Sequence, residues 1–170
     1  MRSLATAILL LTIAAPTAAA QGGLSAGHFG AGFGVSIPTG ALANTHSAGF
    51  NLSWNASYQA VDQPMGIRGE LFYQRFGAKA GATGVKASQA FAGVVDGEYH
   101  FQGFAFHPYL IGGLGLYHVT DAGTHPGFNG GVGIRIPLVG MTAYFEARLH
   151  KVLTDTRSYV SVPISFGLSF

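Results

Sequence analysis

The last eleven residues of this chain alternate strictly between apolar and small side chains. Every second position is apolar, and serine, proline or glycine fills the gaps: Val160, Val162, Ile164, Phe166, Leu168 and Phe170. A period of two predicts a β-strand with one apolar face. A soluble β-sandwich could contain one such strand. The same alternation recurs in nearly every segment of a chain with only 9% charged residues, which favours a barrel whose apolar face contacts lipid.

The N-terminal segment has the features of an export signal. A short positive start at Met1-Arg2-Ser3 precedes an apolar run over Leu4–Ile13, and three alanines before Gln21 fit a small-residue cleavage site. The alternative, a transmembrane helix, needs about 20 apolar residues, and this run is shorter. The sequence has no cysteine for a lipoprotein anchor. We therefore expect a cleaved Sec-type signal peptide over 1–20, and a barrel over 21–170 in the outer membrane of a Gram-negative cell envelope.

Eight alternating segments of about ten residues follow, which is the length of a tilted transmembrane strand. They cover Gly27–Ile37, Ser47–Gln59, residues 67–74, residues 91–101, Pro108–Tyr117, Phe128–Ile136, Met141–His150 and Val160–Phe170. Longer loops, expected at 77–87, 120–126 and 152–157, alternate with short turns. The predicted fold is all-β: an eight-stranded antiparallel up-and-down transmembrane β-barrel. The faces of Pro108–Tyr117 are ambiguous, and we favour Leu110, Leu114 and Leu116 as outward.

Many glycines fall at inward positions of these strands. Gly30, Gly32 and Gly34 lie on the first strand, and Gly131 and Gly133 on a later one. The interior of an eight-stranded barrel is only just wide enough for side chains. We therefore expect small residues on some strands to leave room for large ones on others.

The charged residues segregate on this strand map. Seven of them, including all three glutamates, are expected to point inward: Arg68, Glu70, Asp96, Glu98, Arg135, Glu146 and Arg148. Unpaired charges in a narrow lumen are costly, so these groups should form ion pairs. We interpret them as a structural network that fills the lumen. A proton or ion path is the alternative, but a filled bore of this width conducts poorly.

The remaining basic residues gather at the outer strand ends and in the longer loops. This basic rim comprises Arg75, Lys79, Lys86, Lys151 and Arg157, and it suits the phosphates of lipopolysaccharide; ordinary solvated loop charge is the other interpretation. Without Arg2 the chain has eight basic and seven acidic residues. The small excess gives no support for nucleic-acid binding.

The sequence resembles the outer-membrane β-barrel family of the OmpA/OmpX type. The resemblance extends over Gly27–Phe170 and rests on Pro108–Tyr117, Phe128–Gly133, Phe145–His150 and the terminal Phe-Gly-Leu-Ser-Phe170. It implies that Phe170 is read by the barrel-assembly machinery, and that Glu146 and Arg148 correspond in kind to lumenal ion pairs of the family. It also implies a structural, adhesive or stress-resistance role at the cell surface, for a protein that acts as a monomer.

Two other function classes are weaker. A lipid-modifying barrel enzyme of the deacylase kind would carry a His-x-Ser pair on one strand face, and no such pair occurs here. His46, His118, His125 and Asp121 could meet at the outer rim, but their spacing is not that of a metal site, so we expect neither a metal nor a cofactor. The sequence thus predicts a non-enzymatic outer-membrane barrel with a structural or surface-interaction role. A narrow porin-like pore and a lipid-modifying enzyme are the alternatives.

Overall fold

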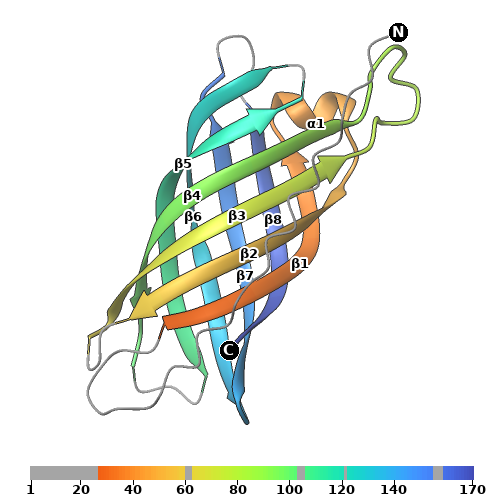
Figure 1. Cartoon of the computed structure of the whole chain (residues 1–170). Coiled ribbons are helices and arrows are strands. Elements are labelled where there is room, and N and C mark those ends of the chain that lie inside the picture. Colours follow the sequence, from red (N-terminus) through yellow and green to blue (C-terminus); the bar gives the residue numbers. More distant parts are fainter. Residues whose placement is uncertain (1–26, 60–62, 103–105, 121, 155–158) are drawn as a thin grey trace, which may run out of the picture.

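The fold follows from the alternation, because each segment pairs with its sequence neighbours. A computed structural model describes residues 27–59, 63–102, 106–120, 122–154 and 159–170. Eight strands form a closed barrel in sequence order (Figure 1). Their bounds are β1 Gly27–Thr39, β2 Gly49–Gln59, β3 Met65–Phe76, β4 Ser88–His100, β5 His107–Val119, β6 Gly123–Leu138, β7 Met141–Val152 and β8 Tyr159–Ser169; one short helix, α1 Ala41–Thr45, lies between β1 and β2.

The first and last strands close the barrel. β1 and β8 pair antiparallel from Gly30↔Ser169 to Thr39↔Val160. The rings of Phe33 and Phe166 meet edge to face across this seam, with centroids 6.0 Å apart. The all-β, eight-stranded up-and-down barrel predicted from the sequence is confirmed.

The two ends of the barrel differ in their connections. At one end, the turn end, residues 60–64, 101–106 and 139–140 join the strands, and β8 finishes there (Figure 1). At the other, the loop end, α1 and residues 77–87, 120–122 and 153–158 make the connections. The described residues include no helix with the length and hydropathy of a membrane span.

Two local features differ from the sequence prediction. Residues 123–126 were expected in a loop, but β6 begins at Gly123 and pairs with β5 from there. Ladder pairing of β6 with β7 begins at Gly127, and the Leu153 N–H donates to the Pro126 carbonyl just before it. Pro126 therefore lies at the end of this ladder, where a missing N–H is tolerated. The helix α1 was also not predicted. It follows Gly40, whose φ of +59° lies in the left-handed region.

The period of two separates two chemically different faces. The outward positions of the strands expose large apolar side chains, among them Phe33, Trp54 and Ile67. Leu110, Leu114 and Leu116 also point outward, as favoured from the sequence, with 47–71% of each residue exposed. The inward positions carry buried polar, charged and aromatic side chains.

Close approach of rings explains several inward glycines. A Cβ at Gly133 would collide with the ring of Tyr109, which lies directly opposite on β5. A Cβ at Gly167 would meet the ring of Tyr144 in the same way on β7. Absence of a side chain on one strand therefore provides the space for a tyrosine on the next.

Candidate functional site: the charged lumen and its two ends

The inward charges of four strands meet in the lumen. β3 supplies Arg68 and Glu70, β4 supplies Asp96 and Glu98, β6 supplies Arg135, and β7 supplies Glu146 and Arg148. Arg135 keeps 15% of its side chain exposed, whereas the side chains of the other six are at most 3% exposed. Each of these positions follows from strand alternation alone. The pairing across the lumen follows from the closed barrel.

Glu146 lies at the centre of the network. One of its carboxylate oxygens accepts a hydrogen bond from Arg68 Nη1 at 2.8 Å and another from the hydroxyl of Tyr109 at 2.5 Å. The other oxygen lies 2.8 Å from Arg148 Nε. Glu146 thus connects two guanidinium groups that belong to β3 and to its own strand.

Arg148, like Arg68, contacts three carboxylates of the network. Besides Glu146, its guanidinium pairs with Glu70 through Nη2 and with Asp96 through Nη1, the latter at 3.1 Å. Asp96 also accepts a hydrogen bond of 2.7 Å from the Asn129 amide. Arg148 therefore connects β3, β4 and β7, and the Asp96–Asn129 hydrogen bond adds β6.

Glu98 forms the part of the network nearest the turn end. It pairs with Arg68 Nη2 at 2.5 Å, and its second oxygen lies 2.8 Å from Arg135 Nη2 and 2.9 Å from His100 Nε2. The ring of Tyr109 stacks on His100 and lies 5.1 Å from the Arg135 guanidinium carbon. The Arg135 guanidinium lies over the Tyr109 ring and so reaches Glu98 on β4, across the intervening strand β5.

The charges of this lumen nearly balance. Four carboxylates face three guanidinium groups, and His100 contributes an additional positive charge when it is protonated. Ion pairs of this kind compensate for the loss of hydration on burial. Tyr109, Asn129 and His100 complete the network and were not among the predicted site residues. The alternation predicted that these side chains point inward, but nothing in the sequence indicated that neutral side chains would take part in an ion-pair network.

An apolar layer closes the lumen toward the loop end. It consists of Phe72, Phe76, Ala90, Ala92, Val94, Tyr117, Val119, Val152 and Tyr159, with Leu42 of α1 packed against it. His150 marks the boundary between this layer and the charges. Its ring stacks on Phe72 at a centroid distance of 4.7 Å and its Nδ1 lies 3.1 Å from the Tyr117 hydroxyl.

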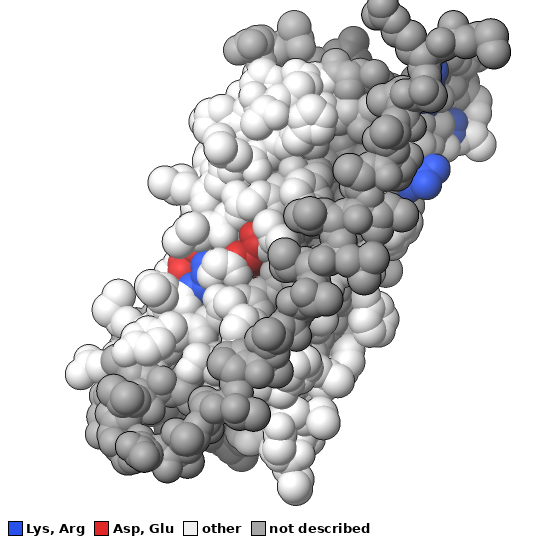
Figure 2. All heavy atoms as spheres, in the orientation of Figure 1, with Lys and Arg blue, Asp and Glu red and all other residues white. Residues whose placement is uncertain are grey.

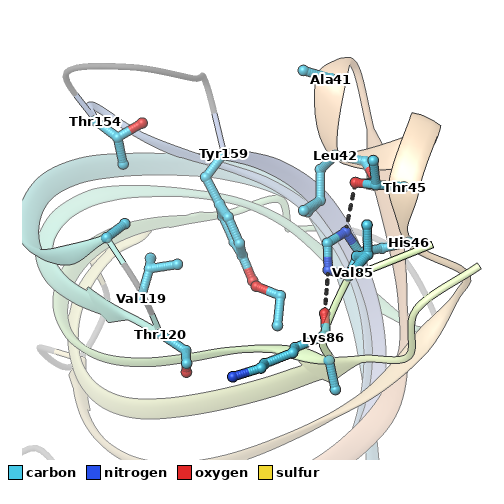
Figure 3. A pocket seen from close by; sticks show the side chains of 14 residues that line it. Ala41, Leu42, Thr45, His46, Val85, Lys86, Val119, Thr120, Thr154 and Tyr159 are labelled. Atoms are coloured by element: carbon cyan, nitrogen blue, oxygen red, sulfur yellow. Dashed lines mark hydrogen bonds between the residues drawn. The ribbon is translucent and has the colours of Figure 1, made fainter. Parts of the chain in front are cut away.

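A cavity of about 560 Å³ lies above this layer at the loop end (Figure 3). Tyr159 and Val119 border it from the barrel, and Leu42 borders it from α1. His46 connects two parts of the rim, because its ring contacts both the Thr45 hydroxyl and the Lys86 carbonyl. The cavity walls combine apolar and polar groups, and its described lining contains no carboxylate.

The basic residues of the predicted rim lie toward the loop end. Arg75, Lys79 and Lys86 are exposed there, and Lys151 is partly exposed with its ammonium 6.0 Å from the Phe128 ring. Figure 2 shows basic atoms near this end on a face that otherwise carries few charged atoms. Lys79 also donates to the Ala43 carbonyl. The fifth member, Arg157, lies outside the described residues.

The histidines of the loop end have separate local partners. His118 contacts the Thr124 hydroxyl and His125 contacts the Ala122 carbonyl. His46 contacts the Thr45 hydroxyl and the Lys86 carbonyl. Among the described residues, no three histidine or acidic side chains are grouped as metal ligands. Asp121, the fourth residue considered from the sequence, lies outside the described part of the chain.

Phe170 lies at the turn end, one residue beyond β8. Its backbone exchanges two hydrogen bonds of 2.9 Å with Phe29 at the start of β1. The side chain is 68% exposed on the outward face. Phe170 therefore takes part in barrel closure through its backbone and leaves its ring free.

Solved structures with the same architecture are small outer-membrane barrels. Neisserial surface protein A superposes with a TM-score of 0.63 at 16% identity, over 84% of this chain and 95% of that one. Ail of Yersinia pestis gives 0.54 at 14% identity, over 86% and 99%. The N-terminal barrel domain of Pseudomonas aeruginosa OprF gives 0.51 at 16% identity, over 85% and 97%.

Similarity at the sequence level is weaker than similarity of fold. No protein-family model matches the chain, and no curated protein sequence matches it. The similarity is therefore one of fold: the closed eight-stranded topology is shared over nearly the full length of each of these structures. This chain has the fold of the OmpA/OmpX-type eight-stranded outer-membrane β-barrels.

Proposed function

We propose that this protein is a small barrel of the bacterial outer membrane with a structural or surface-interaction role, and not a conduit. The proposal rests on the contrast between the outward and inward faces of the barrel wall. Large apolar side chains are exposed around the wall while the charged ones are buried in the lumen. Soluble proteins rarely expose contiguous apolar surface on this scale, whereas a lipid-facing barrel requires it.

The arrangement of the barrel suggests its orientation. Outer-membrane barrels have short periplasmic turns and longer outer loops, so the turn end would face the periplasm and the loop end the exterior. Residues 1–20 would serve as a Sec-type signal peptide, and Phe170 as the signal for the assembly machinery. The basic rim would then contact the phosphates of lipopolysaccharide on the outer side.

Two layers across the lumen support a non-conducting role. An ion crossing the barrel would have to displace the pairs formed by Arg68 and Arg148 and then cross the apolar layer that contains Phe72 and Phe76. Charges that are already paired offer no free site along the bore, and an apolar constriction repels hydrated ions. The narrow-pore alternative would require both layers to rearrange.

Planar-bilayer recording tests the absence of conduction. We expect the refolded protein to give no discrete steps in 1 M KCl. The fluorescence of Trp54, the single tryptophan on the outward face, reports insertion in the same samples and serves as the control. Reproducible steps from the unmodified protein, of one size across preparations, would establish a pore and end the structural interpretation.

A role without catalysis is the second part of the proposal. The one adjacent histidine and serine, His46 and Ser47, do not form a nucleophile and base pair, because the His46 ring is engaged by Thr45 and Lys86. Lipid A from cells with and without the protein should therefore give identical mass spectra. Loss or gain of an acyl chain that depends on the protein would identify an enzyme.

A further inference from the structure

The turn end of the barrel contains a second cavity, which the network does not fill. Its volume is about 420 Å³, and its lining includes His28, Gln59, His100, His107, Arg135 and Thr142. These six residues, which we call the vestibule, all occupy inward positions of their strands. His107 precedes Tyr109 by two residues, for example, and Thr142 precedes Tyr144 by two. The vestibule is thus the last turn-end layer of the lumen.

We propose that the vestibule binds a phosphate group. The first reason is charge. Its described lining contains one arginine and three histidines and no carboxylate. The nearest carboxylate, Glu98, lies below the cavity and is already paired with Arg68, Arg135 and His100. Among the described residues, an anion that enters from the turn end therefore meets Arg135 and the histidines before it meets Glu98.

The second reason is the availability of donors. Arg135 uses Nη2 toward Glu98, and its Nη1 and Nε form no other ion pair or hydrogen bond with the described residues. The guanidinium carbon lies 5.1 Å from the centroid of the Tyr109 ring, which packs against this side chain. A guanidinium fork of this kind matches the oxygen atoms of phosphate. His107 stands directly opposite Arg135 in the β5–β6 ladder, and Thr142 adds a hydroxyl.

The site is built on paired strand residues. Arg135 pairs with His107 on β5 and with Tyr144 on β7, and Thr142 pairs with Pro137 on β6. A cation is a poor occupant, because Arg135 would repel it and no group of metal ligands exists among the described residues. An uncharged ligand would leave the guanidinium donors unused.

The proposal predicts tighter binding in mildly acidic solution. Histidine is the side chain that gains positive charge between pH 8 and pH 6. His28, His100 and His107 face the cavity, Arg135 stays positive, and Glu98 is the one carboxylate among the described residues that contacts them. Sulfate keeps its two charges over this range, so a pH effect on sulfate binding reports the protein alone.

Isothermal titration of the refolded barrel in phosphate-free detergent provides the test. Inorganic phosphate should bind with a Kd at least threefold lower at pH 6 than at pH 8, and sulfate should show the same direction. Arg135→Gln should weaken binding at least tenfold at both pH values. His118→Gln, at the loop end of the barrel, is the matched control and should bind as the unmodified protein does.

A second variant covers the case in which Arg135→Gln fails to fold. His107→Gln leaves every ion pair of Glu98 intact, and it should reduce phosphate affinity severalfold at pH 6 and little at pH 8. Absence of binding up to 20 mM phosphate at pH 6 would overturn the proposal, as would equal binding by His107→Gln and the unmodified protein.

The source of the phosphate group is decided by two further probes. Glycerol 3-phosphate represents the headgroup of a lipid in the periplasmic leaflet, and inorganic phosphate represents a free ion. Affinity for glycerol 3-phosphate equal to or above that for inorganic phosphate would identify a headgroup ligand. Exclusion of glycerol 3-phosphate with retained phosphate binding would identify the free ion. Binding of neither would refute the site.

Discussion

Arg148→Met should destabilise the barrel more than any other single change in the lumen. The guanidinium of Arg148 contacts Glu70, Asp96 and Glu146, so its loss affects three buried carboxylates at once. The four carboxylates of the network would then face the two remaining guanidinium groups, those of Arg68 and Arg135. Methionine fills a similar volume, so the effect would arise from charge and not from a cavity.

The size of this loss in stability depends on the hydrogen-bond and ion-pair partners that each carboxylate keeps after the substitution. Removal of one partner from a buried ion pair costs about 3–5 kcal/mol. Asp96 would keep only the Asn129 amide, and Glu70 would keep Arg68 at 3.9 Å, so we expect a loss at the upper end, about 5 kcal/mol. Glu146→Ala should cost less, about 3 kcal/mol. After that change Arg68 retains Glu98, and Arg148 retains Glu70 and Asp96.

Urea unfolding in lipid vesicles measures both losses. The chain has a single tryptophan, Trp54, which lies on the outward face with 48% exposed, so its fluorescence reports insertion directly. Arg75→Met is the matched control, because Arg75 is exposed on β3 and should cost less than about 1 kcal/mol. The described network would be wrong if the unfolding free energies of Arg148→Met and Arg75→Met differed by less than about 1 kcal/mol. It would also be wrong if Arg148→Met lost less unfolding free energy than Glu146→Ala.

Three further predictions concern the wall, the packing and the terminus. Gly133→Ala should lower the free energy of unfolding by about 1–3 kcal/mol, because the added Cβ collides with the Tyr109 ring. Gly93→Ala, whose Cβ would enter open space, should be near neutral in the same unfolding assay. Leu114→Arg in the middle of β5 should lower the free energy of unfolding in lipid by about 2–4 kcal/mol, and Val139→Arg at the turn end by about 0–1 kcal/mol. Equal losses for the two variants would mean that the wall does not face lipid. Deletion of Phe170 should lower outer-membrane abundance in cells more than it lowers stability of the refolded barrel, because the ring has few neighbours; the reverse ranking would refute the assembly role.

The strand alternation determined most of what could be predicted. Inward and outward faces follow from a period of two, so the positions of Glu70, Glu98 and Arg148 in the lumen were readable from parity alone. The closed barrel followed from the number of segments and the low charge. Even the ambiguous segment, with Leu114 outward, was assigned to the correct face, because three of the four even-numbered positions from 110 to 116 are leucine.

The partners across the lumen could not be predicted in the same way. Sequence parity gives the direction of a side chain but not its reach, and long guanidinium groups cross the bore to strands that are not neighbours. Arg135 reaches Glu98 over the Tyr109 ring, and Arg68 reaches Glu146 on β7. The extension of β6 to Gly123 was missed because Pro126 is a turn signal in most contexts. Proline is tolerated here because it directly precedes Gly127↔Val152, the first residue pair of β6 and β7.

Gel migration of the mature protein after dilution from urea tests the central claim most directly. The account places an apolar wall in contact with lipid, so folding should require detergent or lipid and should yield a heat-modifiable band with a β-rich spectrum. Dilution into buffer alone should yield aggregate. A folded, monomeric and water-soluble product in the absence of detergent would contradict the lipid-facing wall.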